Sequence, residues 1–187
     1  MRKLKVQMQI TIDGFVARPD GTQDWMVTDG DTAGVDFATK IADDHGLILM
    51  GRKMSKDFLP YWEKVVDGGK NMDMYELATR MVDIPKIIFS KTLKSTKGRN
   101  TRVENGDLKT EIQKLKSQPG KDILVYGGAT FVSNLIKEDL VDEFMFFVNP
   151  VAIGAGMSIF HDTRKMKLLN TTEFPSGEVL NHYQTVR

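Results

Sequence analysis

Residues 123–130 read Ile-Leu-Val-Tyr-Gly-Gly-Ala-Thr, and this stretch decides the fold. Its apolar and aromatic first half predicts a short strand covered on both faces, as in the centre of a parallel sheet. The two glycines end the strand, and Phe131, Leu135 and Ile136 continue at helical spacing. A strand that runs through paired glycines into a helix can present backbone N–H groups to a bound phosphate. The stretch therefore predicts an α/β protein with a ligand site at this strand end.

Two other apolar runs, 47–50 and 87–89, share this design. The first is followed by Gly51-Arg52-Lys53 and the second by Ser90-Lys91-Thr92. The carboxyl ends of parallel strands meet at one edge of a sheet, where open α/β proteins bind ligands. The cations and hydroxyl groups of these segments suit a dinucleotide with an extra phosphate, such as NADP. The alternative is that the glycines only make tight turns and that the cations are solvated surface charges.

The rest of the chain alternates between strand and helix patterns. Residues 4–12 alternate apolar and polar side chains, which predicts a strand with one buried face. Residues 167–174 and 178–186 predict a hairpin around Pro175-Ser176-Gly177. We therefore expect a three-layer α/β/α fold with a mixed, mostly parallel central sheet and a C-terminal β-hairpin, built as a single domain over residues 1–187.

Composition narrows the function classes. The chain has 187 residues, 41% of them hydrophobic and 27% charged, and its formal net charge is +1. It therefore lacks the one-sided basic field of a dedicated nucleic-acid or membrane-surface binder. It contains no cysteine and only three widely separated histidines, so we expect neither disulfides nor a metal site. No signal sequence or membrane-spanning run is visible, and we expect a cytoplasmic protein.

Six segments, taken in chain order, carry a resemblance to a known family. They are Thr11 to Ala17, Ile48 to Lys53, Phe89 to Leu93, Val125 to Ala129, Leu140 to Glu143 and Asn149 to Gly156. This ordered set resembles the dihydrofolate-reductase-like superfamily, and within it the reductase domain of riboflavin biosynthesis. The resemblance implies a dihydrofolate-reductase-like fold that binds NADPH and a flat heterocyclic substrate, and it favours a homodimer.

Matching positions imply which residues line the cofactor. Val16 and Ala17 would approach the nicotinamide. The other implied cofactor contacts are Gly51, Arg52, Ser90, Lys91, Thr92, Gly127, Gly128, Ala129 and Thr130. One position departs from the family pattern, because riboflavin reductases commonly have Glu before the paired glycines and this chain has Tyr126. We also expect no deaminase domain of the kind often fused to those reductases, because its zinc-binding cysteines are missing from this sequence, and the chain therefore resembles a stand-alone branch.

Three further residues are candidates for substrate binding or catalysis. Asp36 lies 15 residues before Gly51, near the spacing of the substrate-anchoring acid in dihydrofolate reductases, where it would bind substrate and help to supply a proton. It is equally suited to the first turn of a helix. Asp13 is a second catalytic candidate, although Asp-Gly is also an ordinary turn. Trp25 either covers a planar substrate or belongs to the core, and its size favours the core.

These observations leave several functions open. The leading hypothesis is an NADPH-dependent reductase that transfers a hydride to a small pteridine- or pyrimidine-like heterocycle. The alternatives are a nucleotide-binding protein of the same fold without turnover, the riboflavin-pathway diaminopyrimidine phosphate reductase, and an interaction module whose strand-end motifs are only turns. Both faces of the run 144–148 are apolar, so it is either a central strand or part of a dimer interface. We expect residues 140–160 to take part in a homodimer.

Overall fold

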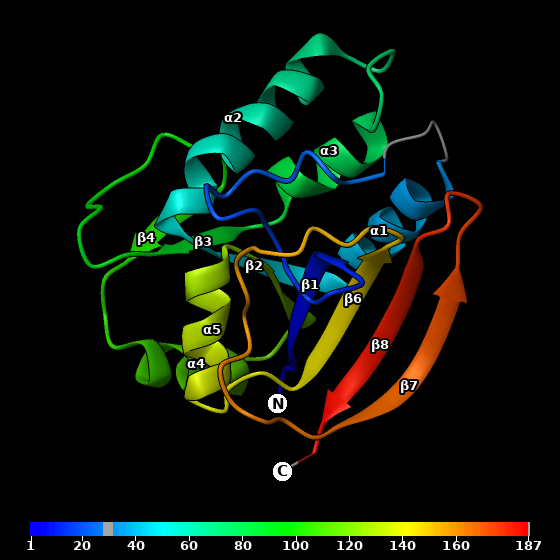
Figure 1. Ribbon diagram of the computed structural model, residues 1–187. Helices are drawn as coiled ribbons and strands as arrows, with labels where there is room; N and C mark the ends of the chain where they lie inside the picture. Colours follow the sequence, from blue (N-terminus) through cyan, green and yellow to red (C-terminus); the bar gives the residue numbers. More distant parts are fainter. Residues whose placement is uncertain (28–31, 187) are drawn as a thin grey trace.

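The computed structural model describes residues 1–27 and 32–186 (Figure 1). In chain order its elements are β1 (Leu4–Thr11), α1 (Ala33–Asp43), β2 (His45–Gly51), α2 (Arg52–Gly68), α3 (Tyr75–Asp83), β3 (Lys86–Phe89), β4 (Thr101–Glu104), α4 (Leu108–Ser117), β5 (Asp122–Gly127), α5 (Ala129–Lys137), β6 (Glu143–Asn149), β7 (Met166–Glu173) and β8 (Val179–Thr185). The three apolar runs of the sequence are thus the strands β2, β3 and β5.

The strands form one sheet in the order β4-β3-β2-β5-β1-β6-β8-β7 (Figure 1). Neighbouring strands run parallel from β4 through to β6 in this order. β8 then pairs antiparallel with β6, and β7 antiparallel with β8. The predicted mixed, mostly parallel sheet with a C-terminal hairpin is therefore confirmed.

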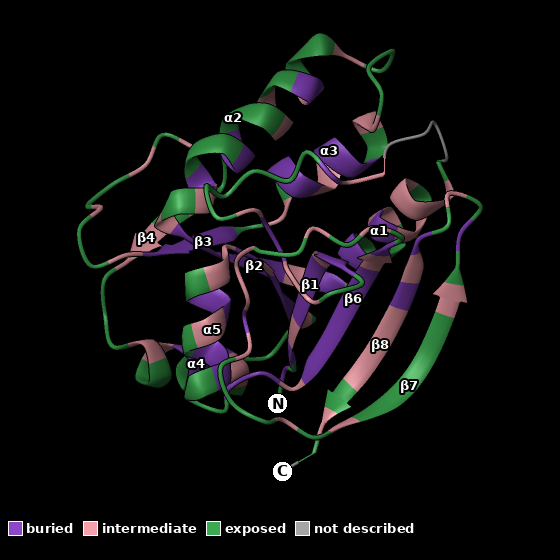
Figure 2. Cartoon of the chain, in the orientation of Figure 1, coloured by how far each residue is buried: buried purple, intermediate pink, exposed green. Residues whose placement is uncertain are grey.

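Helices cover both faces of this sheet, which confirms the three layers. On one face α4 and α5 bury an apolar cluster that includes Ile112 and Leu135 against β1, β2 and β5. On the other face α1, α2 and α3 bury a second cluster, which includes Ile41, Phe58 and Met81. Figure 2 shows the buried strands between these helices, whereas the edge strand β7 is mostly exposed. Because the strands from β4 to β6 run parallel, their carboxyl ends all lie at one edge of the sheet.

β1 does not have the environment that its alternation predicted. It lies between β5 and β6 in the middle of the sheet, and both of its faces are covered. Its apolar row packs with α4 and α5, and its polar row faces the layer of α1, α2 and α3. In that row Gln7 is 6% exposed and Thr11 is 2% exposed. The prediction of one solvent-facing side was therefore wrong, and these polar groups need partners inside the protein.

β6 confirms one of two alternatives for the apolar run 144–148. The strand pairs with β1 and β8, and its two faces belong to the two core clusters. Its apolar character is therefore explained by the core, and the expected homodimer stays a prediction. Among the described residues, no helix combines the length and apolar character that crossing a lipid bilayer requires.

Candidate functional site

The starts of two helices adjoin at the carboxyl edge of the sheet. Gly51 caps the amino end of α2 and Gly128 caps that of α5, both in extended conformation and neither with a capping side chain. A Cβ placed on Gly51 would lie 2.9 Å from Cβ of Phe131 and 3.6 Å from the backbone N of Gly128. The first N–H groups of a helix lack intrahelical partners, and the helix dipole makes this end positive. Two such ends side by side favour an anion.

The paired glycines keep this place open. Gly127 has a φ of +131°, so its conformation favours glycine, and a Cβ there would also lie 3.2 Å from Sδ of Met54. Gly128 differs, because a Cβ on it would meet only Cβ of Met54, at 3.8 Å. The side of Gly128 is therefore open beside the first turn of α5, where the predicted contacts Ala129 and Thr130 lie. Because Gly128 has no side chain, a ligand could approach the backbone there.

The third predicted segment serves mainly its own loop. Oγ of Ser90 accepts the backbone N–H groups of Thr92 and Leu93 at 3.1 and 2.9 Å. Nζ of Lys91 donates to the carbonyl of Gly106 at 2.9 Å. These polar groups therefore stabilise the connections around β3 and β4, and their contacts with a cofactor stay a prediction.

The Arg52 side chain makes no such hydrogen bond within the described residues. It is half-buried at the start of α2, and no hydrogen bond or ion pair ties its guanidinium to the part of the chain that the structure describes. A half-buried guanidinium at a helix start is well placed to bind a phosphate group bidentately. Among the predicted cationic contacts, Arg52 is therefore the one whose charge is available.

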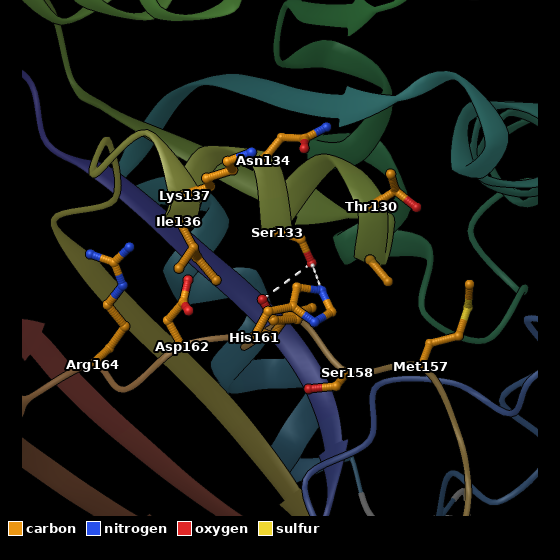
Figure 3. A pocket seen from close by; sticks show the side chains of 12 residues that line it. Thr130, Ser133, Asn134, Ile136, Lys137, Met157, Ser158, His161, Asp162 and Arg164 are labelled. Carbon is orange, nitrogen blue, oxygen red and sulfur yellow. Dashed lines mark hydrogen bonds between the residues drawn. The ribbon is translucent and has the colours of Figure 1, made fainter.

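A cavity of about 400 Å³ continues from the start of α5 along its length. Its walls are α5, from Ala129 to Lys137, and the segment 157–164 (Figure 3). Oγ of Ser133 donates to the carbonyl of Ile159 at 3.1 Å and lies 3.3 Å from Nε2 of His161, which ties the two walls together. The sequence predicted the α5 end of this cavity but gave no signal for residues 157–164, because they reach α5 only through the tertiary fold.

The loop after β1 is fixed to the loop after β6. The backbone N–H of Met157 donates to the carbonyl of Ala17 at 2.8 Å, and that of Val16 donates back to Met157 at 2.9 Å. A Cβ on Gly156 would lie 2.4 Å from the carbonyl oxygen of Ala17, so the two backbones touch only because this residue is glycine. Val16 and Ala17 are buried at this edge. The loop is therefore rigidly held where the resemblance places the nicotinamide.

Asp13 is the anchor of this same loop. Its carboxylate accepts the backbone N–H groups of Ile153 and Gly154, at 3.0 and 2.7 Å, and the hydroxyl of Thr11 at 2.5 Å. The hydrogen bond from Thr11 and those from the two backbone groups hold the pKa of Asp13 below its ordinary value. A carboxylate kept ionised in this way suits an anchor better than a proton donor, and its catalytic role stays a prediction.

Asp36 lies in the first turn of α1 with an exposed side chain. α1 ends at Asp43 and leads at once into the amino end of β2, so its first turn lies toward the carboxyl edge of the sheet (Figure 1). The position of Asp36 is compatible with both alternatives. It is an acidic residue in the first turn of a helix, and it lies on the side of the candidate site. Its role in catalysis and in substrate binding stays a prediction.

Trp25 is buried, with 7% of its surface exposed, yet its indole Nε1 has no hydrogen-bond partner among the described residues. The neighbouring Val27 donates its backbone N–H to Oδ1 of Asn149 at 2.8 Å, and Nδ2 of Asn149 donates to Oε1 of Gln9 at 2.5 Å. The segment that carries Trp25 is therefore tied to the polar row of β1. The expectation of a core position is confirmed, and a contact with substrate stays a prediction.

The model of the RibD C-terminal domain matches residues 2–180. The chain belongs to the RibD C-terminal domain family. Two similar proteins are the uncharacterized Bacillus subtilis proteins YyaP, 33% identical over 95% of this chain and 92% of its own length, and YwjB, 26% identical over 97% of each chain. The family resemblance drawn from the six sequence segments is therefore confirmed.

Solved structures share the RibD C-terminal domain fold with this chain. A candidate riboflavin biosynthesis protein from Shewanella sp. PV-4 aligns with a TM-score of 0.70 and 18% identity over 99% of both chains. The bifunctional diaminohydroxyphosphoribosylaminopyrimidine deaminase and 5-amino-6-(5-phosphoribosylamino)uracil reductase of Thermotoga maritima aligns at 0.66 and 19%, over 99% of this chain and 57% of that one. A pyrimidine reductase-like protein from Corynebacterium diphtheriae gives 0.64 and 13%, over 100% of this chain and 92% of that one. At these identities the likeness shows the fold.

The anchor role of Asp13 is testable by pH. Asp13→Asn removes one of two accepting oxygens, so we expect a lower thermal unfolding midpoint at pH 7. Because the folded state lowers the pKa of Asp13, its stabilisation is present at neutral pH and is lost as pH falls through the acid range. The difference between wild type and variant should therefore shrink at pH 3, as measured by calorimetry. Asp57→Asn, exposed on α2, is the matched control, and equal midpoints for wild type and Asp13→Asn at pH 7 would contradict the anchor role.

Proposed function

We propose that this protein is an NADPH-dependent reductase that transfers a hydride to a small pteridine- or pyrimidine-like heterocycle. The observation that carries the proposal is the pair of adjoining helix starts at Gly51 and Gly128, with the free guanidinium of Arg52 beside them. Backbone N–H groups at a helix start after glycine are suited to bind a phosphate group. Membership of the RibD C-terminal domain family, and the reductase names of two structures that share the fold, support the same function.

The residues present fit such a cofactor. The open side of Gly128, which a Cβ would fill, gives the phosphates access to the first N–H groups of α5. Arg52 would pair with the additional ribose phosphate, and Val16 and Ala17 would hold the nicotinamide against the end of β1. When bound, NADPH supplies the hydride. The protein's own part is to orient the two rings and to exclude water from between them.

Reduction of a C=N bond also needs a proton on nitrogen. Asp36 is the proposed source, because it lies on the site's side of α1 and its carboxylate has no hydrogen bond within the described residues. Asp13 is the second candidate, although its carboxylate already accepts three hydrogen bonds. A carboxylic acid at hydrogen-bond distance from the substrate nitrogen would deliver the proton directly or through one water.

Two other functions retain support. A nucleotide-binding protein without turnover would use the same phosphate site and would lack only hydride transfer. The riboflavin-pathway diaminopyrimidine phosphate reductase is favoured by the names of the Shewanella and Thermotoga structures. Tyr126, in place of the usual Glu, weakens this riboflavin assignment. A screen of heterocycles that follows the loss of NADPH absorbance separates these three functions.

Cofactor choice is the first test. We expect tighter binding of NADPH than of NADH in calorimetric titrations, since only NADPH offers a phosphate to Arg52. Arg52→Ala should weaken NADPH binding by roughly 1–3 kcal/mol, the scale of a hydrogen bond to a charged group. It should leave NADH binding unchanged, and the exposed neighbour Lys53→Ala serves as the control. Equal affinities of wild type for the two cofactors would defeat the proposed role of Arg52.

The proton donor is the second test. Once a substrate has been found by the screen, Asp36→Asn should lower turnover by about 10²–10⁴, the usual scale of general acid catalysis. The affinity for NADPH should stay within a few-fold, because Asp36 is not placed among the phosphate contacts. Full turnover of Asp36→Asn together with loss in Asp13→Asn would reverse the two roles. Full turnover of both variants would show that neither carboxylate delivers the proton.

A further inference from the structure

The polar row of β1 is out of place in this fold. A strand in the centre of a sheet, with helices over both faces, is normally apolar on both sides. The row that faces α1, α2 and α3 is nevertheless made of Lys5, Gln7, Gln9 and Thr11. Where a sequence breaks its local pattern in this way, the position is expected to serve function.

Three of the four side chains are accounted for by protein partners. Nζ of Lys5 lies 3.0 Å from Oδ2 of Asp122, Oε1 of Gln9 accepts from Asn149, and the hydroxyl of Thr11 donates to Asp13. Gln7 is different. It is 6% exposed, and its Oε1 has no partner among the described residues. A buried amide oxygen without a donor destabilises a fold unless something else binds it.

Tyr126 is the residue whose side chain lies next to the Gln7 amide. Burial raises the pKa of the Tyr126 hydroxyl, and a hydrogen bond from the Gln7 side chain opposes that rise. Its ring also packs on Phe58, at 5.5 Å between ring centroids. Part of the Tyr126 residue is nevertheless accessible to solvent. Tyr126 immediately precedes Gly127 and Gly128, which places the pair next to the candidate cofactor site.

The chemistry of the pair defines what it can bind. The Gln7 amide lies close to the Tyr126 hydroxyl, and no hydrogen bond within the described residues uses the hydroxyl proton of Tyr126. Oε1 of Gln7 and this hydroxyl thus offer one acceptor and one donor side by side. Their complement is a neutral edge with an N–H next to a C=O, as in the lactam of a pyrimidinone or a pterin. A carboxylate at position 7 would instead accept two hydrogen bonds, as an amidine edge requires.

We propose that Gln7 and Tyr126 form the specificity-determining pair of the substrate site and select a planar heterocycle by its lactam edge. The inference deepens the proposed reductase function and rests on it for the identity of the site. It concerns binding alone, and it therefore has a readout that does not depend on hydride transfer.

Direct titration with two small probes tests this pair. 5-Aminouracil presents lactam edges, and 2,4-diaminopyrimidine presents amidine edges. Wild type should bind 5-aminouracil more tightly, and Gln7→Leu should weaken that binding by about 10- to 100-fold, as expected when a buried acceptor is lost. Gln7→Glu should reverse the preference toward 2,4-diaminopyrimidine. Gln113→Leu makes the same change on the exposed face of α4 and should have no effect.

The outcomes separate this inference from the proposed function. A reversed preference in Gln7→Glu, with unchanged NADPH affinity, supports recognition by Gln7 and is not produced by a merely structural role. Failure of wild type to bind either probe, equal affinity for both, or unchanged binding in Gln7→Leu would overturn the inference. If the probes bind in a Gln7-dependent way but no heterocycle causes NADPH oxidation, the inference stands and the reductase function is wrong.

Discussion

The close approach of α2 and α5 is the constraint on which the rest of the structure depends. β2 and β5 are hydrogen-bonded neighbours, with Met50 opposite Gly127, and each runs directly into its helix. The two helix starts can adjoin only because position 51 has no side chain, since a Cβ there would lie 2.9 Å from Cβ of Phe131. The close contact of Gly51 with Phe131 therefore also places the two positive helix ends beside each other. Packing and anion binding are consequences of the same residues.

Local sequence patterns predicted the elements whose signal is itself local. The continuous apolar runs 47–50, 87–89 and 123–126 became buried parallel strands, because such runs suit only positions covered on both faces. β4 was missed, since its four residues Thr101–Glu104 form an edge strand that pairs through its backbone and carries no apolar stripe. α2 was also missed, since no helix was assigned to residues 52–68, and the structure places Pro60, which is atypical of a helix interior, within it.

The site was predictable to the extent that it lies at strand ends. The glycines at 51, 127 and 128 were found because glycine before a helix is a pattern in the sequence. The hydrogen bonds of Ser90 and Lys91 within their own loop were not predicted, because they depend on where β4 and α4 begin. Gln7 was missed for a different reason. Its alternation with apolar neighbours is typical of a solvent-facing position, and only the placement of β1 between β5 and β6 turns it into a buried amide with an unpaired oxygen. Conflict between local pattern and final environment is the signal that could have been used.

Titration of NADPH into Gly128→Ala tests the central claim that the open side of the paired glycines is a cofactor site. Gly128 has φ of −79° and ψ of −177°, and its nearest neighbour would be 3.8 Å from an added Cβ, so alanine fits the folded chain. The account predicts a thermal unfolding midpoint equal to or above that of wild type, because alanine also restricts the unfolded chain. It predicts at the same time a loss of NADPH affinity of at least about tenfold, the scale of a lost charge-assisted contact. Undiminished NADPH affinity in a folded Gly128→Ala protein would contradict it.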